Sequence, residues 1–378
     1  MVGKIFFLVS SMNPGGAERV AANLAHAWIS RGIHVTLLVT YSGRDDCFYP
    51  LSNAVDLRYL ADEVNASRSR VLAYAVRFLA LRRMIRRERP DVVVSFLTNV
   101  NVAALLATLG THVPAIVCER TYPPRLPLGK FWGRVRRWTY PLATRVAMLT
   151  SEGLDWLQRE IPQARGVVMP NPIPYPLPVT PPELAPESVV ACERKMLLAV
   201  GRMSEEKGFS GLIQAFASLT GQHPQWDLVI LGDGPLRSIL ADQIRRLGLS
   251  ERVLLPGRAG NIGAWYKRAD LYVLSSRVEG FPNTLGEAMA HGCAAVSFDC
   301  DTGPRDLIRH DVDGLLVPSG DVGALAESLG RLMQDDALRT QMAVRALEVR
   351  DRYSMERVLG LWDQLFADAC RQRKGADD

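Results

Sequence analysis

A proline-rich segment divides this chain into two halves with the same internal pattern. Residues 170–186 hold eight prolines in seventeen positions, a density that neither a helix nor a central strand accommodates, because proline lacks the backbone N–H. With 378 residues the chain is long enough for about two domains. We predict an N-terminal domain over residues 1–172, a linker over 173–194 and a C-terminal domain over 195–354, and we allow a last helix near 355–378 to pack back on the first domain.

Each half alternates short apolar runs with segments of helical periodicity. The runs cover residues 4–9, 34–39, 91–96, 114–118 and 145–149 before the linker, and 195–200, 227–231, 252–255, 270–275, 294–298 and 314–317 after it. This alternation is typical of a parallel sheet covered by helices. We predict an α/β chain with two Rossmann-like, doubly wound domains that face each other across a cleft, with ligands beyond the carboxyl ends of the strands.

Composition excludes several classes of protein. The chain is 48% hydrophobic and 22% charged, which excludes a mainly disordered protein. No apolar run reaches the roughly 18 residues that span a bilayer, and the run after Lys4 is too short for a signal peptide. The six cysteines form no CxxC pair, which favours reduced thiols over disulfides or zinc ligands. We predict a cytoplasmic protein.

Charge is unevenly distributed between the halves. Residues 1–172 contain 22 Lys and Arg against 12 Asp and Glu, whereas residues 173–378 contain 23 against 28. The first half is therefore the basic one, and it is expected to meet an acidic partner.

The loop after the first apolar run of the second half combines two cations with two glycines. Arg202 and Lys207 lie between Gly201 and Gly208. Arg as a fork and Lys as a point charge can both face one diphosphate, although surface cations are often only solvated. The position at a strand end favours phosphate binding over the solvated alternative.

Two glutamates eight positions apart follow the run that ends near Ser275. Glu279 precedes Gly280 on a loop, and Asn283 or Thr284 is the expected N-cap of a helix that carries Glu287 in its first turn. The helix macrodipole alone can explain a carboxylate at position 287. It does not explain Glu279, which precedes the helix and is the stronger functional candidate.

The first strand runs into a second glycine loop, Gly15-Gly16-Ala17-Glu18. Paired glycines before a helix let an anion approach the free backbone N–H groups, and a tight structural turn is the alternative. The spacing is not GxGxxG, and the second strand ends in Val39-Thr40-Tyr41 without the acid that binds ribose, so NAD binding is disfavoured.

Together with Gly232-Asp233-Gly234-Pro235, these loops resemble the donor-binding half of retaining glycosyltransferases of family 4, which have the GT-B fold. The N-terminal glycine loop extends the resemblance to nearly the whole chain. The resemblance implies that Glu279 contacts the transferred sugar, that Glu287 binds the nucleotide ribose, and that the basic pair holds the donor diphosphate. The donor site it implies comprises Gly16, Arg202, Lys207, Gly232, Asp233, Gly234, Gly280, Phe281, Pro282, Asn283, Thr284, Leu285 and Glu287, with Glu279, Arg202, Lys207, Arg120 and Glu119 as catalytic candidates.

Fixed positive charge in a dry site can stabilise the nucleoside diphosphate that leaves when a sugar–phosphate bond breaks. Arg202, Lys207 and helix N-terminal amides supply such charge, so we predict neither a metal nor a cofactor, with a UDP-sugar as substrate. Asp299-Cys300-Asp301 superficially matches a metal-binding DxD, but the sequence continues into Thr302-Gly303-Pro304 like another phosphate-side turn.

One position departs from the family pattern. Many members place a histidine after the strand that ends here at Cys118, where this chain has Glu119-Arg120-Thr121. We place Glu119 and Arg120 at the rim of the active site and leave the proton acceptor open.

The basic character of the first half is concentrated in residues 68–89, with eight arginines and one acid. Helical spacing of Tyr74, Phe78 and Ile85 predicts an amphipathic helix, either a membrane-surface element or a packed Rossmann helix with a solvated basic face. A second basic cluster at residues 130–138 adds two tryptophans, which prefer the membrane interface. The residues predicted to bind the acceptor are Gly15, Gly16, Arg70, Arg77, Arg82, Arg83 and Arg86.

Within the family, the chain most resembles bacterial transferases that extend polyprenyl-diphosphate-linked glycans with N-acetylgalactosamine, through Gly15-Gly16-Ala17-Glu18-Arg19, Val94-Ser95-Phe96-Leu97, Glu279-Gly280-Phe281-Pro282-Asn283 and Thr302-Gly303-Pro304. The resemblance implies a retaining transferase that moves a sugar, best assigned as N-acetylgalactosamine, from a UDP-sugar to a polyprenyl-diphosphate-linked saccharide and forms an α-glycosidic bond. The enzyme is expected to attach peripherally to the anionic cytoplasmic face of the inner membrane and to bind no nucleic acid. A hexosyltransferase of O-antigen, capsule or lipopolysaccharide core is the alternative substrate class. A nucleotide-sugar epimerase or an inactive membrane-binding module is the alternative outside the transferases.

Overall fold

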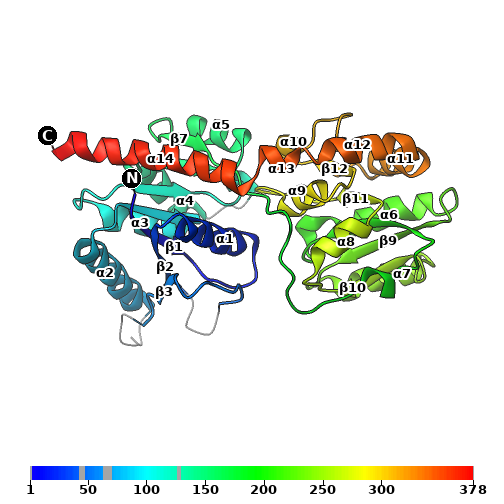
Figure 1. Cartoon of the computed structure of the whole chain (residues 1–378), viewed down its shortest axis with the longest axis horizontal. Helices are drawn as coiled ribbons and strands as arrows, with labels where there is room; N and C mark the ends of the chain where they lie inside the picture. The colour runs from blue at the N-terminus through cyan, green and yellow to red at the C-terminus, as the bar shows by residue number, and fades with distance from the viewer. Residues whose placement is uncertain (1, 42–46, 63–69, 126–128, 378) are drawn as a thin grey trace. The chain divides into compact units, whose positions relative to one another are not determined.

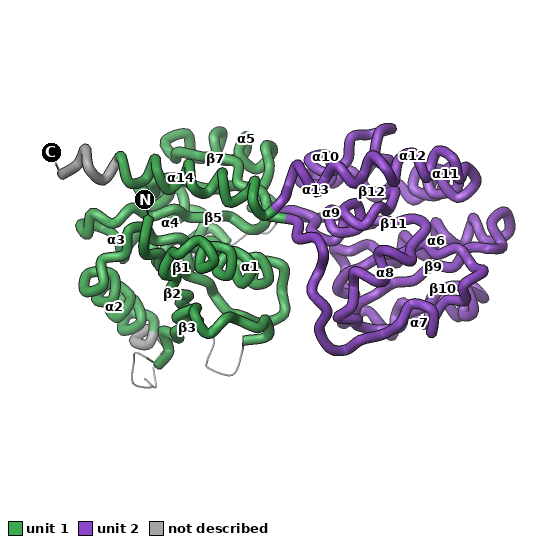
Figure 2. The backbone as a smooth tube through the Cα atoms, in the orientation of Figure 1, with its two compact units in different colours: residues 1–172, 355–378 green, residues 173–354 purple. Residues whose placement is uncertain are grey.

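The computed structural model describes residues 2–41, 47–62, 70–125 and 129–377, with the backbone alone at 70–73 and 372–377. The chain forms two compact units (Figure 2): unit 1 comprises Met1–Pro172 and Met355–Asp378, and unit 2 comprises Ile173–Ser354. Residues 173–194, the predicted linker, are thus part of unit 2.

Unit 1 is built on a seven-stranded sheet in the order β3-β2-β1-β4-β5-β6-β7, in which every neighbouring pair is parallel. Its strands are β1 (Lys4–Val9), β2 (His34–Val39), β3 (Asp56–Tyr59), β4 (Val92–Phe96), β5 (Ala115–Cys118), β6 (Arg145–Met148) and β7 (Gly166–Val168). The central strands β1 and β4 are apolar along nearly their whole length because helices cover both faces of the sheet.

Helices form a layer on each face of this sheet (Figure 1). They are α1 (Gly16–Ser30), α2 (Arg70–Glu88), α3 (Thr98–Thr108), α4 (Gly129–Thr139), α5 (Ser151–Glu160) and α14 (Met355–Asp377), with short 3-10 turns η1 (Pro123–Arg125) and η2 (Tyr140–Leu142). α1 and α14 pack against one face, where Trp28 meets Trp362 edge-on at 5.4 Å. α2 and α3 pack against the other face, over Phe6 and Leu8.

Unit 2 repeats the design with a six-stranded parallel sheet in the order β10-β9-β8-β11-β12-β13. Its strands are β8 (Lys195–Val200), β9 (Trp226–Leu231), β10 (Val253–Gly257), β11 (Leu271–Leu274), β12 (Ala295–Asp299) and β13 (Gly314–Pro318). Its helices are α6 (Phe209–Leu219), α7 (Arg237–Arg246), α8 (Ile262–Arg268), α9 (Asn283–Ala290), α10 (Pro304–Leu307), α11 (Val322–Gln334), α12 (Asp336–Ala346) and α13 (Val349–Arg352), with 3-10 turns η3 (Pro186–Ser188) and η4 (Glu205–Lys207).

Both sheets reverse their strand order beside their first strand. In unit 1 this switch point lies between β1 and β4, and in unit 2 it lies between β8 and β11. Ligands of doubly wound sheets bind beyond the carboxyl ends of the strands at such a point. The fold prediction is therefore confirmed for each unit, and the loops after these four strands are where a site is expected.

Candidate active site

The site in unit 2 is built by the loops after β8 and β11, which are hydrogen-bonded neighbours at the switch point. Lys207 ends the first loop and Glu279 lies in the second, 72 positions further along the chain. Nζ of Lys207 donates a hydrogen bond to Oε1 of Glu279 at 2.7 Å. Two residues that the sequence analysis selected separately therefore form one ion pair.

The Lys207–Glu279 pair is partly shielded from water. The side chains are 21% and 10% exposed. Burial alone would lower the pKa of Lys207, but the neighbouring Glu279 carboxylate outweighs it, and the net pKa is raised. Lys207 therefore stays protonated at neutral pH and supplies a fixed positive charge.

Backbone contacts hold the two loops against each other. Gly208 adopts φ +66°, and a Cβ at this position would lie 2.2 Å from the carbonyl oxygen of Ser275. Oγ of Ser275 donates to the carbonyl oxygen of Lys207 at 2.8 Å, and the N–H of Arg277 donates to that of Glu206 at 2.8 Å. Only glycine fits at position 208, so the close approach that carries the ion pair depends on it.

The loop after β9 joins the same cluster. Gly232 has φ +132°, and a Cβ there would lie 1.9 Å from the carbonyl oxygen of Gly201. The N–H of Met203 donates to the carbonyl oxygen of Asp233 at 3.0 Å. The predicted donor residues Gly232, Asp233 and Gly234 thus lie against the loop that carries Arg202 and Lys207.

The loop after β12 supports the glutamate from the other side. Oγ1 of Thr302 donates to the carbonyl oxygen of Glu279 at 2.6 Å. Burial raises the pKa of the nearby Cys300 thiol to about 12, so it is neutral at physiological pH. Ser275 and Thr302 both position the site through backbone carbonyls. For Ser275, the only signal of this role in the sequence is its place at the end of an apolar run.

The remaining predicted donor residues differ in exposure. Arg202 is exposed, whereas Phe281 and Pro282 are buried. α9 begins at Asn283, and Pro282 occupies the N-cap position, so the expected cap at Asn283 or Thr284 is wrong by one or two residues. The other predicted donor residues lie just before α9 or in its first turn: Gly280, Asn283, Thr284 and Leu285. Oγ1 of Thr284 accepts a hydrogen bond from the hydroxyl of Tyr272 at 2.9 Å.

Glu287 lies in the second turn of α9, not in the first, because the helix starts earlier than expected. It is 1% exposed, and its Oε2 accepts a hydrogen bond from the hydroxyl of Tyr266 at 3.2 Å. The carboxylate is therefore held by the unit itself.

Asp299, one of the two acids that flank Cys300, is bound by another side chain of unit 2. Asp299 is the last residue of β12 and accepts two hydrogen bonds from Arg305, at 2.9 and 2.8 Å. Among the residues that the structure describes, no three His, Cys, Asp or Glu side chains lie together in a way that would hold a metal ion. Asp299 is thus occupied as a partner of Arg305.

In unit 1, the glycine loop after β1 leads into α1. The N–H of Gly15 donates to the hydroxyl oxygen of Tyr49 at 3.0 Å, and that hydroxyl donates to the carbonyl oxygen of Gly15 at 2.8 Å. Gly16 is the first residue of α1, and Ser11 Oγ donates to Oε1 of Glu18 at 3.3 Å. The loop stands at the switch point, as its sequence position predicted.

Glu119 lies inside unit 1, with its side chain 1% exposed. Oγ1 of Thr98 donates to both carboxylate oxygens, at 2.8 and 2.9 Å, and the hydroxyl of Tyr140 donates to Oε1. Burial raises the pKa of Glu119. The carboxylate is thus the centre of an internal network at the carboxyl end of β5, below the rim position expected for it.

Arg120 is also buried, at 8% exposure. It donates to Oδ1 of Asn171, and its guanidinium carbon lies 4.1 Å from the centroid of the Phe96 ring. Burial lowers the pKa of Arg120 to about 10, which leaves it charged at neutral pH. A buried cation therefore stands at the position where the sequence resemblance led us to expect a histidine.

The arginines of α2 have different environments. Arg82 donates to the carbonyl oxygens of Leu106 and Ala107 at the end of α3, at 3.3 and 3.0 Å. Arg77 lies half-buried beside the carbonyl oxygen of Thr40, at 3.5 Å, whereas Arg83 and Arg86 are exposed. The side chain of Arg70 lies outside the described residues. Tyr74, expected on the packed face, is 56% exposed.

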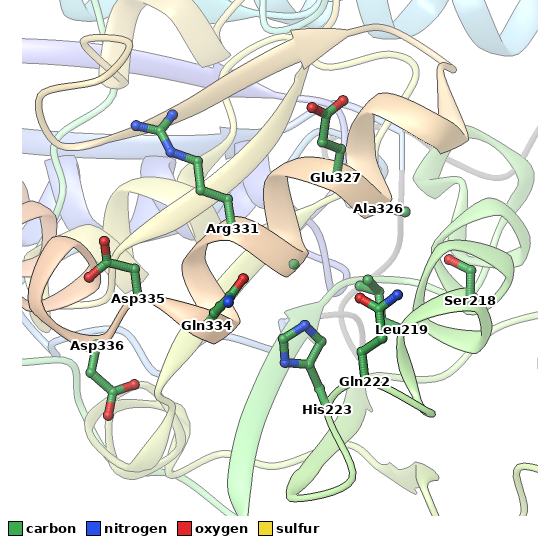
Figure 3. Close-up of a pocket in the computed structure, with 11 residues that line it drawn as sticks. Ser218, Leu219, Gln222, His223, Ala326, Glu327, Arg331, Gln334, Asp335 and Asp336 are labelled. Carbon is green, nitrogen blue, oxygen red and sulfur yellow. The ribbon is translucent and has the colours of Figure 1, made fainter.

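A cavity of about 830 Å³ lies elsewhere in unit 2, between the end of α6 and helices α11 and α12 (Figure 3). His223 and Gln222 line it from the segment before β9, and Arg331 and Gln334 line it from α11. This segment enters the sheet at its amino edge, so the cavity lies at the opposite edge from Lys207 and Glu279. It is a separate, polar hollow with no part in the loop cluster.

Two protein-family models match the chain, one on each half. The model for Glycosyltransferase Family 4 matches residues 14–175, and the model for Glycosyl transferases group 1 matches residues 182–349.

Curated relatives align over almost the whole chain. A Campylobacter jejuni α-1,4-N-acetyl-D-galactosaminyltransferase, named for a PP-undecaprenol-linked saccharide of GalNAc and diNAcBac, is 28% identical over 97% of this chain and 98% of its own length. The Rhizobium meliloti lipopolysaccharide core biosynthesis glycosyltransferase LpsE is 28% identical over 93% of this chain and 96% of its own.

A solved structure shares the fold. Anabaena HepE in complex with UDP superposes with a TM-score of 0.81 at 20% identity, over 96% of this chain and 99% of HepE. No described helix of the present chain is both long and apolar enough to cross a bilayer.

Proposed function

The chain belongs to glycosyltransferase family 4 and has the GT-B fold, and on that premise we propose that it moves a sugar from a UDP-sugar to a polyprenyl-diphosphate-linked saccharide. We assign N-acetylgalactosamine as the sugar and an α-glycosidic bond, formed with retention, as the product. The reaction serves the assembly of a surface glycan or a glycoprotein glycan.

The observation that carries this proposal is the Lys207–Glu279 pair at the switch point of unit 2. When the bond between sugar and phosphate breaks, the electron pair leaves with the diphosphate, whose added negative charge needs fixed cations. Lys207 supplies one such charge and the exposed Arg202 a second. Glu279 stands beside Lys207, where its carboxylate can contact the transferred sugar. In this proposal the enzyme uses neither a metal nor a cofactor.

The nucleotide half of the donor is assigned to the surrounding loops. The HepE structure was solved with UDP, which supports a uridine nucleotide for a chain of the same fold. The glycines at 208 and 232 pack against backbone carbonyl oxygens, and such glycine loops can turn their amides toward the diphosphate of the donor. Glu287, held by Tyr266, is assigned to the ribose hydroxyls.

The acceptor is assigned to unit 1, which carries the positive charge of the chain. Arg77 is the strongest candidate for the lipid diphosphate, because its half-buried guanidinium lies beside Thr40 at the carboxyl edge of the sheet, and its Nε has no hydrogen-bond partner in the described part of the chain. The PP-undecaprenol in the name of the Campylobacter relative supports this acceptor class. Such a lipid places the enzyme at the cytoplasmic face of the inner membrane.

A second substrate class has support of its own. LpsE, a lipopolysaccharide core glycosyltransferase, matches the chain at the same identity as the Campylobacter enzyme and over a similar length. A hexose donor and a lipopolysaccharide, O-antigen or capsule acceptor therefore form the alternative.

A thermal-shift screen of the purified chain against UDP, GDP, ADP and a panel of UDP-sugars tests the donor assignment. A ligand that binds only the folded state stabilises that state by about 2.7 kcal/mol when its concentration is a hundred times Kd. This stabilisation raises Tm. We expect a shift with UDP and a larger one with UDP-N-acetylgalactosamine. A shift with UDP-glucose or UDP-galactose alone selects the hexosyltransferase, and no shift with any uridine nucleotide contradicts the proposal.

A further inference from the structure

The surface formed by α4 and α5 in unit 1 has no part in the proposed chemistry, yet it contains a basic pocket of about 260 Å³. The side chains and backbone that line it are those of Lys130, Gly133, Arg134, Arg136, Arg137, Trp156, Glu160 and Ile161. Four cations therefore surround a hollow that contains one acid.

Ion pairs already engage half of these cations. Arg137 pairs with Glu160 at 2.5 Å, and Arg136 lies 3.8 Å from the Glu119 carboxylate. Lys130 and Arg134 are exposed and form no ion pair with any residue that the structure describes. The pocket thus presents two uncompensated charges one helical turn apart.

Arg136 fixes the pocket to the body of unit 1. Its guanidinium carbon lies 4.6 Å from the centroid of the Trp156 ring, and its side chain is 13% exposed. Stacking on α5 and attraction to Glu119 hold this side of α4 inward. The exposed cations of α4, Lys130 and Arg134, therefore lie on a helix that is fixed to unit 1 through Arg136.

The same helix displays two large aromatic side chains. Phe131 is 69% exposed and Trp138 is 68% exposed. They are seven residues apart, two helical turns, so both lie on one side of α4. Tryptophan beside exposed cations is the composition of a helix that lies in a membrane interface, with the ring at the level of the head groups.

We propose that the α4–α5 surface docks on the bilayer, with the pocket around Lys130 and Arg134 receiving the phosphate of an anionic phospholipid and with Phe131 and Trp138 entering the interface. The purpose of this docking rests on the proposed lipid-linked acceptor. The docking itself is a property of unit 1 and is measured without donor or acceptor.

Co-sedimentation of the full chain with vesicles tests the proposal. The vesicles are phosphatidylcholine alone or phosphatidylcholine with phosphatidylglycerol, and the variant is Lys130→Gln with Arg134→Gln. The matched control is Arg245→Gln with Arg246→Gln on α7, which removes the same charge from another exposed helix. We expect the α4 variant to partition about thirtyfold more weakly onto the anionic vesicles, equivalent to about 1 kcal/mol for each charge, and the α7 control to bind like the unaltered chain.

A second variant separates insertion from charge. Trp138→Ser keeps every cation, and we expect it to weaken binding and to remove the part of the fluorescence blue shift that vesicles induce. Equal sedimentation of the unaltered chain and the α4 double variant overturns the proposal, provided that circular dichroism shows both to be folded. A Tm increase with inorganic phosphate in a chain that binds no vesicles also overturns it, and identifies a free-phosphate site instead.

Discussion

The two units share a sheet topology but differ in what they place at the carboxyl edge of the sheet, after β8 and β11 in unit 2 and after β5 in unit 1. In unit 2, Lys207 and Glu279 pair in a loop cluster that retains access to solvent, with side-chain exposures of 21% and 10%. In unit 1, Glu119 is 1% exposed and accepts hydrogen bonds from Thr98 and Tyr140. The same fold thus has a charged, solvent-accessible edge in unit 2 and a buried polar network in unit 1.

Topology therefore sets where a site can form, whereas local backbone packing decides whether charged side chains reach that site. Unit 2 has glycines where its loops cross, so backbones meet and side chains are left free for a ligand. Unit 1 directs the hydroxyls of Thr98 and Tyr140 at its carboxylate, and those partners occupy it. We therefore expect changes at the unit 2 edge to affect transfer, and changes at Glu119 to affect stability.

The largest expected effect is on kcat, and it should differ between the two ends of β8. Lys207→Ala removes the cation after β8, and Glu279→Gln removes the charge of its partner; each should lower kcat by about 10²–10³-fold, the usual cost of removing a group that stabilises developing charge. Lys195→Ala is the matched control, because Lys195 also faces carboxylates, Asp270 and Asp336, but at the amino end of β8.

Initial rates with UDP-N-acetylgalactosamine and a lipid-linked acceptor measure this difference. Lys195→Ala should change the rate less than about threefold, as surface ion pairs contribute little. Normal turnover by folded Lys207→Ala would contradict the assignment of unit 2 as the catalytic edge.

The second prediction concerns the internal network of unit 1. Glu119→Ala removes the acceptor of two hydroxyl groups and leaves a cavity, so we expect a loss of about 3 kcal/mol in the free energy of unfolding. Glu119→Gln keeps the volume and one acceptor oxygen and should cost less. Chemical unfolding with urea measures both.

The sign of the pH dependence gives this prediction a second test. Because burial raises the folded-state pKa of Glu119 above its ordinary 4.5, the folded state holds its proton more tightly than the unfolded state. The unaltered chain should therefore lose stability relative to Glu119→Gln as pH rises above about 4.5 and through the folded-state pKa. A constant difference over that range would mean that Glu119 is not desolvated, and that the two edges are more alike than their burial indicates.

The third prediction compares two glycines with the same backbone angle. Gly208 has φ +66° and lies against Ser275, whereas Gly248 has φ +69°, and a Cβ added there would meet no other atom within 4 Å beyond its chain neighbours. Gly248→Ala should cost about 1 kcal/mol through its left-handed backbone alone. Gly208→Ala adds a collision with a carbonyl oxygen, so we expect about 2 kcal/mol more and loss of the Tm increase with UDP. Equal costs would show that the loop crossing is not tight.

The sequence was sufficient to predict which loops meet at the carboxyl edge of the unit 2 sheet, because the apolar runs mark where its strands end. Each of the eleven apolar runs overlaps a strand of the structure, and parallel order brings the segments after β8 and β11 together. The two strands that no run predicted, β3 and β7, form the edges of the first sheet. β7 has only three residues. β3 carries Asp56 and Arg58, which form an ion pair with each other, and Arg58 also donates to Glu88 at the end of α2.

Unit 1 was harder to predict because its polar groups depend on distant partners. Nothing near Glu119 in the sequence indicates that Tyr140, 21 positions later, donates to it. Likewise, the spacing of the arginines in α2 does not reveal that Arg82 caps the end of α3 while Arg83 and Arg86 stay in solvent. Such differences arise from tertiary packing, which no local pattern records.

The smallest expected effect comes from a carboxylate of unit 1 that behaves oppositely to Glu119. Burial alone would raise the pKa of Glu88, but hydrogen bonds from Arg58 at 2.6 Å and from Lys4 at 2.9 Å lower it from 4.5 to about 2. Its contribution to stability is therefore present above pH 4.5 and is lost as pH falls from there through about 2. Since solvent screens the pair, we expect Glu88→Gln to cost less than about 1 kcal/mol at neutral pH.

Urea unfolding between neutral pH and the acid limit of the fold measures the Glu88 effect. The difference between the unaltered chain and Glu88→Gln should shrink as pH falls below 4.5, whereas the difference for Glu119→Gln should follow the opposite direction. Asp363→Asn, which breaks the more exposed pair with Arg31, is the control and should show almost no cost. If Glu88→Gln and Glu119→Gln shift in the same direction with pH, then burial and ion pairing do not distinguish these two carboxylates, and unit 1 has no desolvated network to set against the open edge of unit 2.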